Sequence, residues 1–368
     1  MKITVNQKAM AEAVLNIQRA VSTKSTIPAL EGILLETGNG TVTLNSYNLE
    51  LGMTTTLPAV VEQPGSIILG ARLFSDIVRR MPGEELTVST DEKNVAQIVC
   101  GASNFSVIGI PAEEFPEFPS VSQTTSFKME HKLLKSMIRQ TLFAVSQSDA
   151  KPVHTGSLFE LKDGVLHVVS VDGYRLAMRA EAVSFTETLS FVVPGKTLSE
   201  VLKLLRDDDS ELTICIGPRH ILFTIDQYTV LSNLLEGEFL DYRAAIPNDA
   251  TTVITMKTRE LMDSVERVSL LITDRVKSPV RSVFENDRVK LSCSTAMGRA
   301  VDEAPCTMQG DMVEMGFNNR YLLDALHNAE DDEVRIEMRG PLSPMKIMPV
   351  SGDSYLFLVL PVRLKNEP

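Results

Sequence analysis

The chain repeats itself three times with a period of about 124 residues, and this repeat restricts the possible folds more than any other feature of the sequence. One seven-residue segment occurs three times, at residues 72–78, 196–202 and 320–326. Each copy begins with a basic residue, and apolar and acidic residues follow at matching positions. Strand-like segments recur at nearly the same spacing, in residues 34–36, 158–160 and 283–285. We therefore expect three similar domains in tandem.

Each copy also begins with an amphipathic stretch that follows a short apolar segment. These stretches cover residues 7–21, 131–145 and 258–272, and their apolar residues recur at helical intervals. The order within a copy is strand, helix, several strands, helix, several strands. This order favours an α+β fold with two helices and mostly antiparallel sheets in each domain, because a doubly wound parallel fold needs more helices.

Prolines mark the borders between the copies, in residues 115–119 and 241–247. We predict domains at residues 1–121, 122–248 and 249–368. If the three domains stand side by side in an arc, equivalent helices fall on one face. A twofold partner can close such an arc through contacts between first and last domains, so the repeat favours half of a closed ring.

Composition narrows the class of protein. Hydrophobic residues make up 43% and charged residues 23% of the chain, which is typical of a globular protein. No apolar run reaches the roughly 20 residues of a membrane helix, and the amino terminus lacks the apolar stretch of a signal peptide, so we expect a cytoplasmic protein. Four widely separated cysteines predict buried thiols, with no disulfide framework, no metal and no cofactor: Cys100, Cys215, Cys293 and Cys306.

Positive charge is concentrated in the predicted helices, although the chain as a whole carries −12. Residues 7–21, 71–81, 130–146, 195–206, 257–272 and 318–328 carry net charges of +1, +2, +2, +2, 0 and 0, which leaves −19 for the rest. A hole lined by such helices binds backbone phosphates without reading bases, which suits sliding along DNA. The alternative is that Lys and Arg simply favour helices while acidic residues gather in turns.

The sequence lacks the motifs of common enzymes. Residues 194–197 read PGKT, but the first glycine of a phosphate-binding loop is replaced by Ser190. Asp76, Glu200 and Asp324 each follow a basic residue by four positions, which is the spacing of a surface ion pair. Two other classes stay open: an enzyme whose active site forms at domain junctions, and a peptide-binding scaffold that ignores DNA.

Three segments carry a resemblance to a known family. They read VVSVDGYRLA at residues 168–177, EGEFLDYR at 236–243 and LVLPVRL at 358–364, and they occur in the expected order. With them the chain resembles the bacterial DNA polymerase III beta subunit, the sliding clamp, over its whole length. The resemblance implies a non-enzymatic processivity factor: a head-to-tail homodimeric ring that encircles duplex DNA without sequence preference and tethers the replicative polymerase.

The resemblance also implies a groove between the second and third domains that captures short linear motifs of polymerases, the clamp loader and repair proteins. Its wall comprises His154, Val171, Gly173, Tyr174, Arg175, Leu176, Leu240, Ala245, Ser343, Leu360, Pro361, Val362 and Arg363. Apolar side chains flanked by two arginines suit the hydrophobic end of a peptide. Core packing is the alternative for Leu176 and Leu360.

By the same resemblance, DNA contacts fall on Lys24, Arg72, Ser148, Lys151 and Lys196, for which solvated surface charge is the alternative. The dimer seam resembles a meeting of Leu73, Ile77, Met81, Phe105 and Val107 with Leu270 and Leu271 of a second copy. Core burial within the first domain is the alternative for Ile77.

The sequence departs from the family pattern in a few places. Pro152 and Val153 stand where relatives can carry aromatic residues that touch DNA. His154 and Leu240 stand where the groove is often lined by a small apolar residue or proline, and Ala244 replaces a basic residue. Residues 365–368 extend the chain beyond the usual terminus, and we expect them to cover part of the groove entrance.

Overall fold

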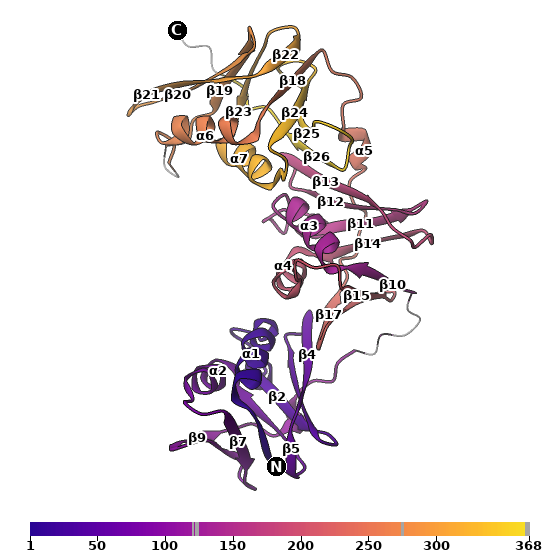
Figure 1. Cartoon of the computed structure of the whole chain (residues 1–368), viewed down its shortest axis with the longest axis vertical. Coiled ribbons are helices and arrows are strands. Elements are labelled where there is room, and N and C mark those ends of the chain that lie inside the picture. Colours follow the sequence, from indigo (N-terminus) through magenta and orange to yellow (C-terminus); the bar gives the residue numbers. More distant parts are fainter. Residues whose placement is uncertain (120, 122–124, 274–275, 365–368) are drawn as a thin grey trace. The chain divides into compact units, whose positions relative to one another are not determined.

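The computed structural model describes residues 1–119, 121, 125–273 and 276–364 (Figure 1). The chain divides into two compact units, and the second sequence repeat contributes to both. The first unit contains Met1–His131 and Lys203–Leu234, and the second contains Lys132–Leu202 and the chain from Leu235 onward. The extension at residues 365–368 lies outside the described residues.

Among the described residues, six helices of ten to twelve residues come in pairs, one pair for each sequence repeat. They are α1 (Gln7–Ile17) with α2 (Ala71–Arg80), α3 (His131–Leu142) with α4 (Gly195–Leu204), and α6 (Thr258–Ser269) with α7 (Asn319–Asn328). The predicted helices are confirmed, although a 3₁₀ turn, η1 (Gln18–Ala20), takes over the end of the first. Short helical turns fill some connections: η2 (Pro28–Glu31), η3 (Ala112–Glu114), η4 (Pro152–Thr155) and α5 (Tyr242–Ala245).

Helix α2 illustrates how the sequence sets these elements. Phe74, Ile77 and Val78 recur at helical spacing and are buried, and the helix packs against α1. Arg79 and Arg80 are exposed in its last turn, where their charge favours the negative end of the helix dipole. The helix therefore turns an apolar face to its domain and a basic face to solvent.

The strands form four sheets, and every strand pair among the described residues is antiparallel, as predicted. The first unit contains a five-stranded sheet, in the order β5 (Val60–Gln63), β1 (Lys2–Asn6), β7 (Glu85–Thr90), β8 (Val95–Cys100), β9 (Ser103–Ile108). Its second sheet has eight strands, β10 (Thr125–Glu130), β15 (Glu211–Ile216), β16 (His220–Ile225), β17 (Tyr228–Asn233), β4 (Leu51–Pro58), β3 (Thr41–Tyr47), β2 (Gly32–Thr37), β6 (Ser66–Gly70).

The second unit contains the other two sheets. The nine-stranded sheet runs β14 (Leu189–Pro194), β11 (Gly156–Lys162), β12 (Val165–Val171), β13 (Arg175–Ala182), β26 (Tyr355–Val359), β25 (Met345–Pro349), β24 (Glu333–Met338), β18 (Thr252–Lys257), β22 (Thr307–Gly310). The four-stranded sheet runs β21 (Gly298–Pro305), β20 (Arg288–Thr295), β19 (Val280–Glu285), β23 (Val313–Phe317). In this unit α3, α4, α6 and α7 lie on one side, and β11–β14 lie on the other (Figure 1).

Two sheets cross from one sequence repeat to the next. Strand β4 of the first repeat pairs with β17 of the second, and Met53 lies opposite Val230. Strand β13 of the second repeat pairs with β26 of the third, and Ala177 lies opposite Phe357. Ala177 is the repeat counterpart of Met53, 124 residues further on, and Phe357 holds the same place in the strand pairing of its repeat as Val230 does in its own. Both junctions therefore use the same register.

Two strands of the repeat stay at sheet edges. Strand β9 is the first-repeat counterpart of β17 and β26, and it ends the five-stranded sheet. Strand β21 is the third-repeat counterpart of β4 and β13, and it ends the four-stranded sheet. An edge strand offers unpaired backbone groups to another chain.

No helix in the described part of the chain is both long and apolar enough to cross a membrane.

Candidate functional site

In the second unit, the hairpin between β12 and β13 lies beside the C-terminal segment that follows β26. The Asp172 Oδ1 atom accepts the backbone N–H groups of Tyr174 at 2.9 Å and Arg175 at 3.1 Å, which closes a tight turn. Gly173 has a φ of +89°, a conformation that glycine adopts without strain. The backbone N–H of Leu360 then donates to the carbonyl oxygen of Tyr174 at 3.0 Å. The two segments therefore form neighbouring walls.

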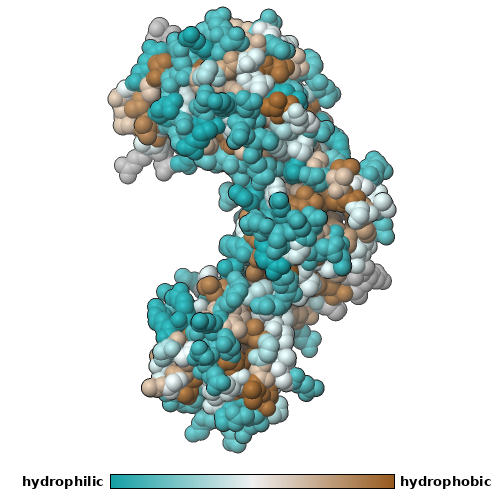
Figure 2. All heavy atoms as spheres, viewed as in Figure 1, coloured by the Kyte–Doolittle hydropathy of each residue, from teal (hydrophilic) through white to brown (hydrophobic). Residues whose placement is uncertain are grey.

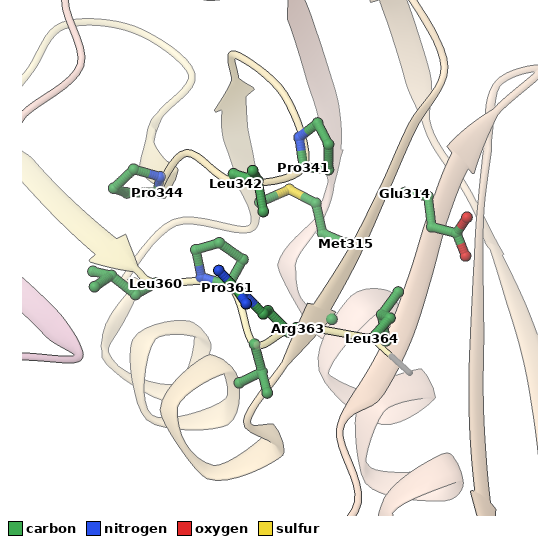
Figure 3. Close-up of a pocket in the computed structure, with 11 residues that line it drawn as sticks. Glu314, Met315, Pro341, Leu342, Pro344, Leu360, Pro361, Arg363 and Leu364 are labelled. Carbon is green, nitrogen blue, oxygen red and sulfur yellow. The ribbon is translucent and has the colours of Figure 1, made fainter. Parts of the chain in front are cut away.

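A cavity of about 610 Å³ opens along the C-terminal segment (Figure 3). Leu360 to Leu364 form one wall, and Pro341, Leu342 and Pro344 form the other. Leu360 and Val362 keep exposed apolar side chains here, while Arg363 brings a positive charge. Ser343 lies in the loop of the second wall and is half-buried. Glu314, Met315 and Gly316 of β23 line the remaining side, where Glu314 pairs with Arg281. The apolar walls and Arg363 suit a peptide with hydrophobic residues and an acidic group.

A second cavity, of about 500 Å³, lies between residues 150–154 and 236–241. The ring of His154 packs edge-on against Phe239 at 5.3 Å, and the Leu240 side chain is exposed at its rim. Burial lowers the pKa of His154, and the charge of Lys151 lowers it further. The imidazole is therefore neutral near pH 7 and adds an uncharged surface to this cavity.

The floor beneath the hairpin is apolar. Val171, Leu176 and Leu358 are buried in one cluster, which also contains Val153 and Tyr242. Ala245, on α5, is exposed. Of the predicted groove residues, Val171 and Leu176 are thus core residues, and Tyr174, Leu240, Leu360 and Val362 supply exposed apolar surface. In Figure 2, hydrophobic surface gathers over the strands of the second unit, whereas its helix-bearing side is mostly hydrophilic.

Arg175 does not face solvent as a free charge. Its side chain is 11% exposed, its Nε donates to Asp172 Oδ2 at 2.9 Å, and its Nη1 donates to Asp324 on α7. The guanidinium carbon also lies 4.6 Å from the ring centre of Tyr321 and 5.5 Å from that of Phe143. The interpretation of Asp324 as the partner of a basic residue four positions earlier on its own helix misses this interaction, because Arg175 is 149 residues away.

The predicted DNA-contact residues are all exposed. Lys24 lies in a loop and Arg72 in the first turn of α2, both in the first unit. Ser148 and Lys151 lie in the loop after α3, and Lys196 lies in the first turn of α4, all in the second unit. Pro152 and Val153 lie in η4, and the Val153 side chain is buried. Exposed positive charge on helical turns and loops can contact phosphates.

The predicted seam residues divide into exposed and buried side chains. Leu270 is 79% exposed, Leu73 is 54% exposed, and Phe105 is 45% exposed. Val107 and Leu271 are half-buried, while Ile77 and Met81 are buried within the first unit. Sequence reasoning missed Ile108, which is 82% exposed at the end of β9. Ile108 ends the edge strand β9, and no local pattern shows which strand of a sheet stands at its edge.

The described residues contain no group of three or more His, Cys, Asp or Glu side chains that could hold a metal ion. The four cysteines are free thiols, and Cys100 and Cys293 are buried as predicted. The prediction of burial is wrong for Cys215 and Cys306, which are half-buried.

Three tandem α+β repeats joined through shared antiparallel sheets define the DNA clamp fold. Models of the DNA polymerase III beta subunit match the chain in three parts: the N-terminal domain at residues 1–119, the central domain at 128–241 and the C-terminal domain at 243–363. The chain therefore belongs to the DNA polymerase III beta subunit family, the beta sliding clamps, and shares their clamp function.

Relatives match over nearly the whole length. The beta sliding clamp of Bacillus subtilis is 30% identical over 376 residues, which cover 99% of this chain and 100% of the relative. A DNA polymerase III beta subunit structure from Eubacterium rectale is 31% identical, with a TM-score of 0.94 over 98% of this chain and 99% of that one. A sliding clamp of Pseudomonas aeruginosa, solved bound to griselimycin, is 26% identical, with a TM-score of 0.92 over 99% and 100%.

Proposed function

We propose that the chain forms a head-to-tail homodimer that encircles duplex DNA and tethers the replicative polymerase, without a catalytic site of its own. The domains are residues 1–121, 122–248 and 249–368. One observation carries this proposal: two junctions between repeats use the same strand register, and the strands of a third such junction are left at sheet edges. A second copy of the chain can supply the missing pairing at each end. A protein that works on DNA with the replicative polymerase is cytoplasmic in a bacterium.

The register of the seam follows from the internal junctions. Ala300 is the counterpart of Ala177, because each pairs with a matching residue of its own hairpin, Cys293 and Ser170. Phe105 is the counterpart of Phe357, because the strand pairing leads from β1 through β7 and β8 to Phe105 as it leads from β18 through β24 and β25 to Phe357. Since Ala177 lies opposite Phe357, we place Phe105 of one copy opposite Ala300 of the other.

The helices beside this seam supply its apolar contacts. Leu270 follows α6 as Phe143 follows α3, and Phe143 packs edge-on against Phe357 at 5.4 Å. Leu270 should therefore pack against Phe105 and Leu73 of the second copy. Burying such exposed apolar side chains stabilises a dimer by about 25 cal/mol per Å² before the cost of association.

DNA binding in this proposal is electrostatic. The residues that contact phosphates are all exposed: Lys24, Arg72, Ser148, Lys151 and Lys196. The remaining surface carries the excess of acidic residues and repels DNA. Weak contacts without base readout let the ring slide, while its closure keeps it on the duplex.

The groove in this proposal binds short linear segments of the polymerase, the clamp loader and repair proteins. The two cavities beside the Tyr174–Leu360 backbone contact supply apolar surface for such a segment. A Pseudomonas aeruginosa sliding clamp was solved bound to griselimycin, and this compound can be tested here as a competitor of a labelled peptide.

The oligomeric state tests the proposal directly. The wild-type chain should have a solution mass near twice 40.5 kDa by light scattering, and Leu270→Asp should have the monomer mass. Met312→Asp is a matched control, because Met312 is also exposed in the third domain but lies outside the seam residues. A wild-type monomer at micromolar concentration would contradict the proposed ring.

A further inference from the structure

We infer that Arg175 and Asp324 form a positioning pair that holds the walls of the groove in their binding-competent arrangement, and that Arg175 does not contact the charged groups of a ligand. This inference rests on the proposed peptide-binding function of the groove. It assigns Asp324, which the sequence analysis interpreted as a surface ion pair, to the binding machinery.

The guanidinium group of Arg175 is held on several sides by its neighbours. Arg175 donates from Nε to Asp172 and from Nη1 to Asp324, so two carboxylates already neutralise its charge. The rings of Tyr321 and Phe143 lie near the guanidinium carbon. A ligand carboxylate would have to break one of these ion pairs to reach Arg175. Neither cavity described above includes Arg175 in its lining.

The Arg175–Asp324 pair connects helix α7 to the hairpin between β12 and β13. Asp172 and Arg175 belong to the hairpin of the second domain, whereas Asp324 lies on α7 of the third. Tyr321, one turn earlier on α7, stacks on Tyr174 with ring centres 5.9 Å apart. The carbonyl oxygen of Tyr174 in turn accepts the N–H of Leu360. The pair thus fixes α7 to the hairpin, and the hairpin holds the C-terminal wall.

The residues that correspond to Arg175 and Asp324 in the other repeats do not form such a pair. The counterpart of Arg175 is Leu51 in the first repeat and Gly298 in the third, since each ends the matching turn of its hairpin. The counterparts of Asp324 are Glu200 in the second repeat and Asp76 in the first, where Asp76 pairs with Arg79 and Arg80 of its own helix. Neither Leu51 nor Gly298 has a charge to offer them. The ion pair across a junction therefore occurs at the junction that carries the groove and has no equivalent in these counterparts.

A positioning pair and a direct contact predict different responses to ligand charge. If the pair sets the fraction of molecules with a competent groove, its loss weakens every groove ligand by the same factor. If Arg175 instead binds a ligand carboxylate, the loss is confined to ligands that carry that carboxylate. Two forms of one peptide, with a free or an amidated C-terminus, distinguish these cases.

The experiment uses a fluorescein-labelled peptide that copies a clamp-binding segment of the replicative polymerase, prepared with a free or an amidated C-terminus. Asp324→Asn and Arg175→Lys should each weaken both forms about fivefold, because lysine lacks the planar fork of arginine and asparagine lacks the charge. The double variant should bind no more weakly than either single variant, since the two side chains act as one unit.

Asp249→Asn is the matched control, because Asp249 makes an exposed ion pair with Arg339 in the same domain. It should leave both affinities unchanged, as should the dimer mass of every variant. Loss for the acid form alone, or unchanged binding in Asp324→Asn, would overturn the positioning role while the groove stands. Failure of the wild-type chain to bind either peptide would instead overturn the groove itself.

Discussion

Leu360 donates its backbone N–H to the carbonyl oxygen of Tyr174 at 3.0 Å, which extends the pairing of β13 and β26 beyond the last residue of β26. The groove walls are thus joined by backbone groups, while the side chains of both residues stay exposed beside the bond. Truncating these side chains should therefore remove ligand contacts without separating the walls.

Shortening the groove side chains should weaken peptide binding and leave the dimer intact. Leu360→Ala removes apolar surface that a ligand covers, so we expect roughly tenfold weaker binding by fluorescence anisotropy, equivalent to about 1.4 kcal/mol. Arg363→Ala should weaken acidic peptides in particular. Val350→Ala is a control, because Val350 is exposed outside the groove. Unchanged affinity in both groove variants would refute this assignment.

The seam register predicts a specific cross-link. Opposed residues of antiparallel strands have Cα atoms about 4.5–5.5 Å apart, within the range that a disulfide spans. A chain with Phe105→Cys and Ala300→Cys should form covalent dimers under mild oxidation, seen on a non-reducing gel. The pair Phe105→Cys and Glu303→Cys shifts the register by three residues and should not. Equal cross-linking of both pairs would rule out the proposed register.

If a lysine contacts a DNA phosphate, removing it should make the DNA affinity depend less steeply on salt concentration than in the wild type. If Lys196 contacts one phosphate, Lys196→Ala should reduce the slope of log K against log salt by about 0.9 for duplex DNA. Lys162→Ala is the control, because Lys162 is exposed at the end of β11, away from the helices. The slopes come from fluorescence titrations at several salt concentrations. The same slope in wild type and Lys196→Ala would exclude this residue as a contact.

The half-buried side chain of His167 should make the folded protein less stable in acid. Burial lowers the pKa of His167, and the charge of Arg243 lowers it further, although Glu160 and Asp353 oppose this. An unfolded chain takes up the proton at a pKa of about 6.5, so the free energy of unfolding should fall as the pH drops below that value.

Urea unfolding at pH 7.5 and 5.5 measures this effect. His167→Gln removes the titrating group, so the variant should lose less stability than wild type between the two pH values. Carboxylates that titrate in this range affect both proteins alike and cancel in the comparison. An equal loss in both would show that His167 does not contribute.

The sequence predicts the elements of each repeat well, because those signals are local. The apolar residues of α2 recur at helical spacing, and their burial follows from that spacing. The repeat period also predicts that the elements recur in three domains. The family motifs at residues 168–177 and 358–364 lie next to each other in the structure, as strands β13 and β26 and the segments around them.

The sharing of sheets between repeats has no local signal. Nothing in β4 identifies β17 as its neighbour, because their pairing joins residues more than 170 positions apart. The engagement of Arg175 by Asp324 is missed for the same reason, since a basic residue on the same helix offers Asp324 a nearer candidate in the sequence. Pairings between residues so far apart in the sequence are visible only in the three-dimensional structure.

Topological linkage to DNA tests the central claim most directly. The chain is loaded by its clamp loader onto a nicked circular plasmid, and protein bound to DNA is separated from free protein by gel filtration before and after one restriction cut. A closed ring should stay with the circle and be lost once the DNA is linear, because it slides off the ends. Equal retention on circular and linear DNA would contradict a sliding ring.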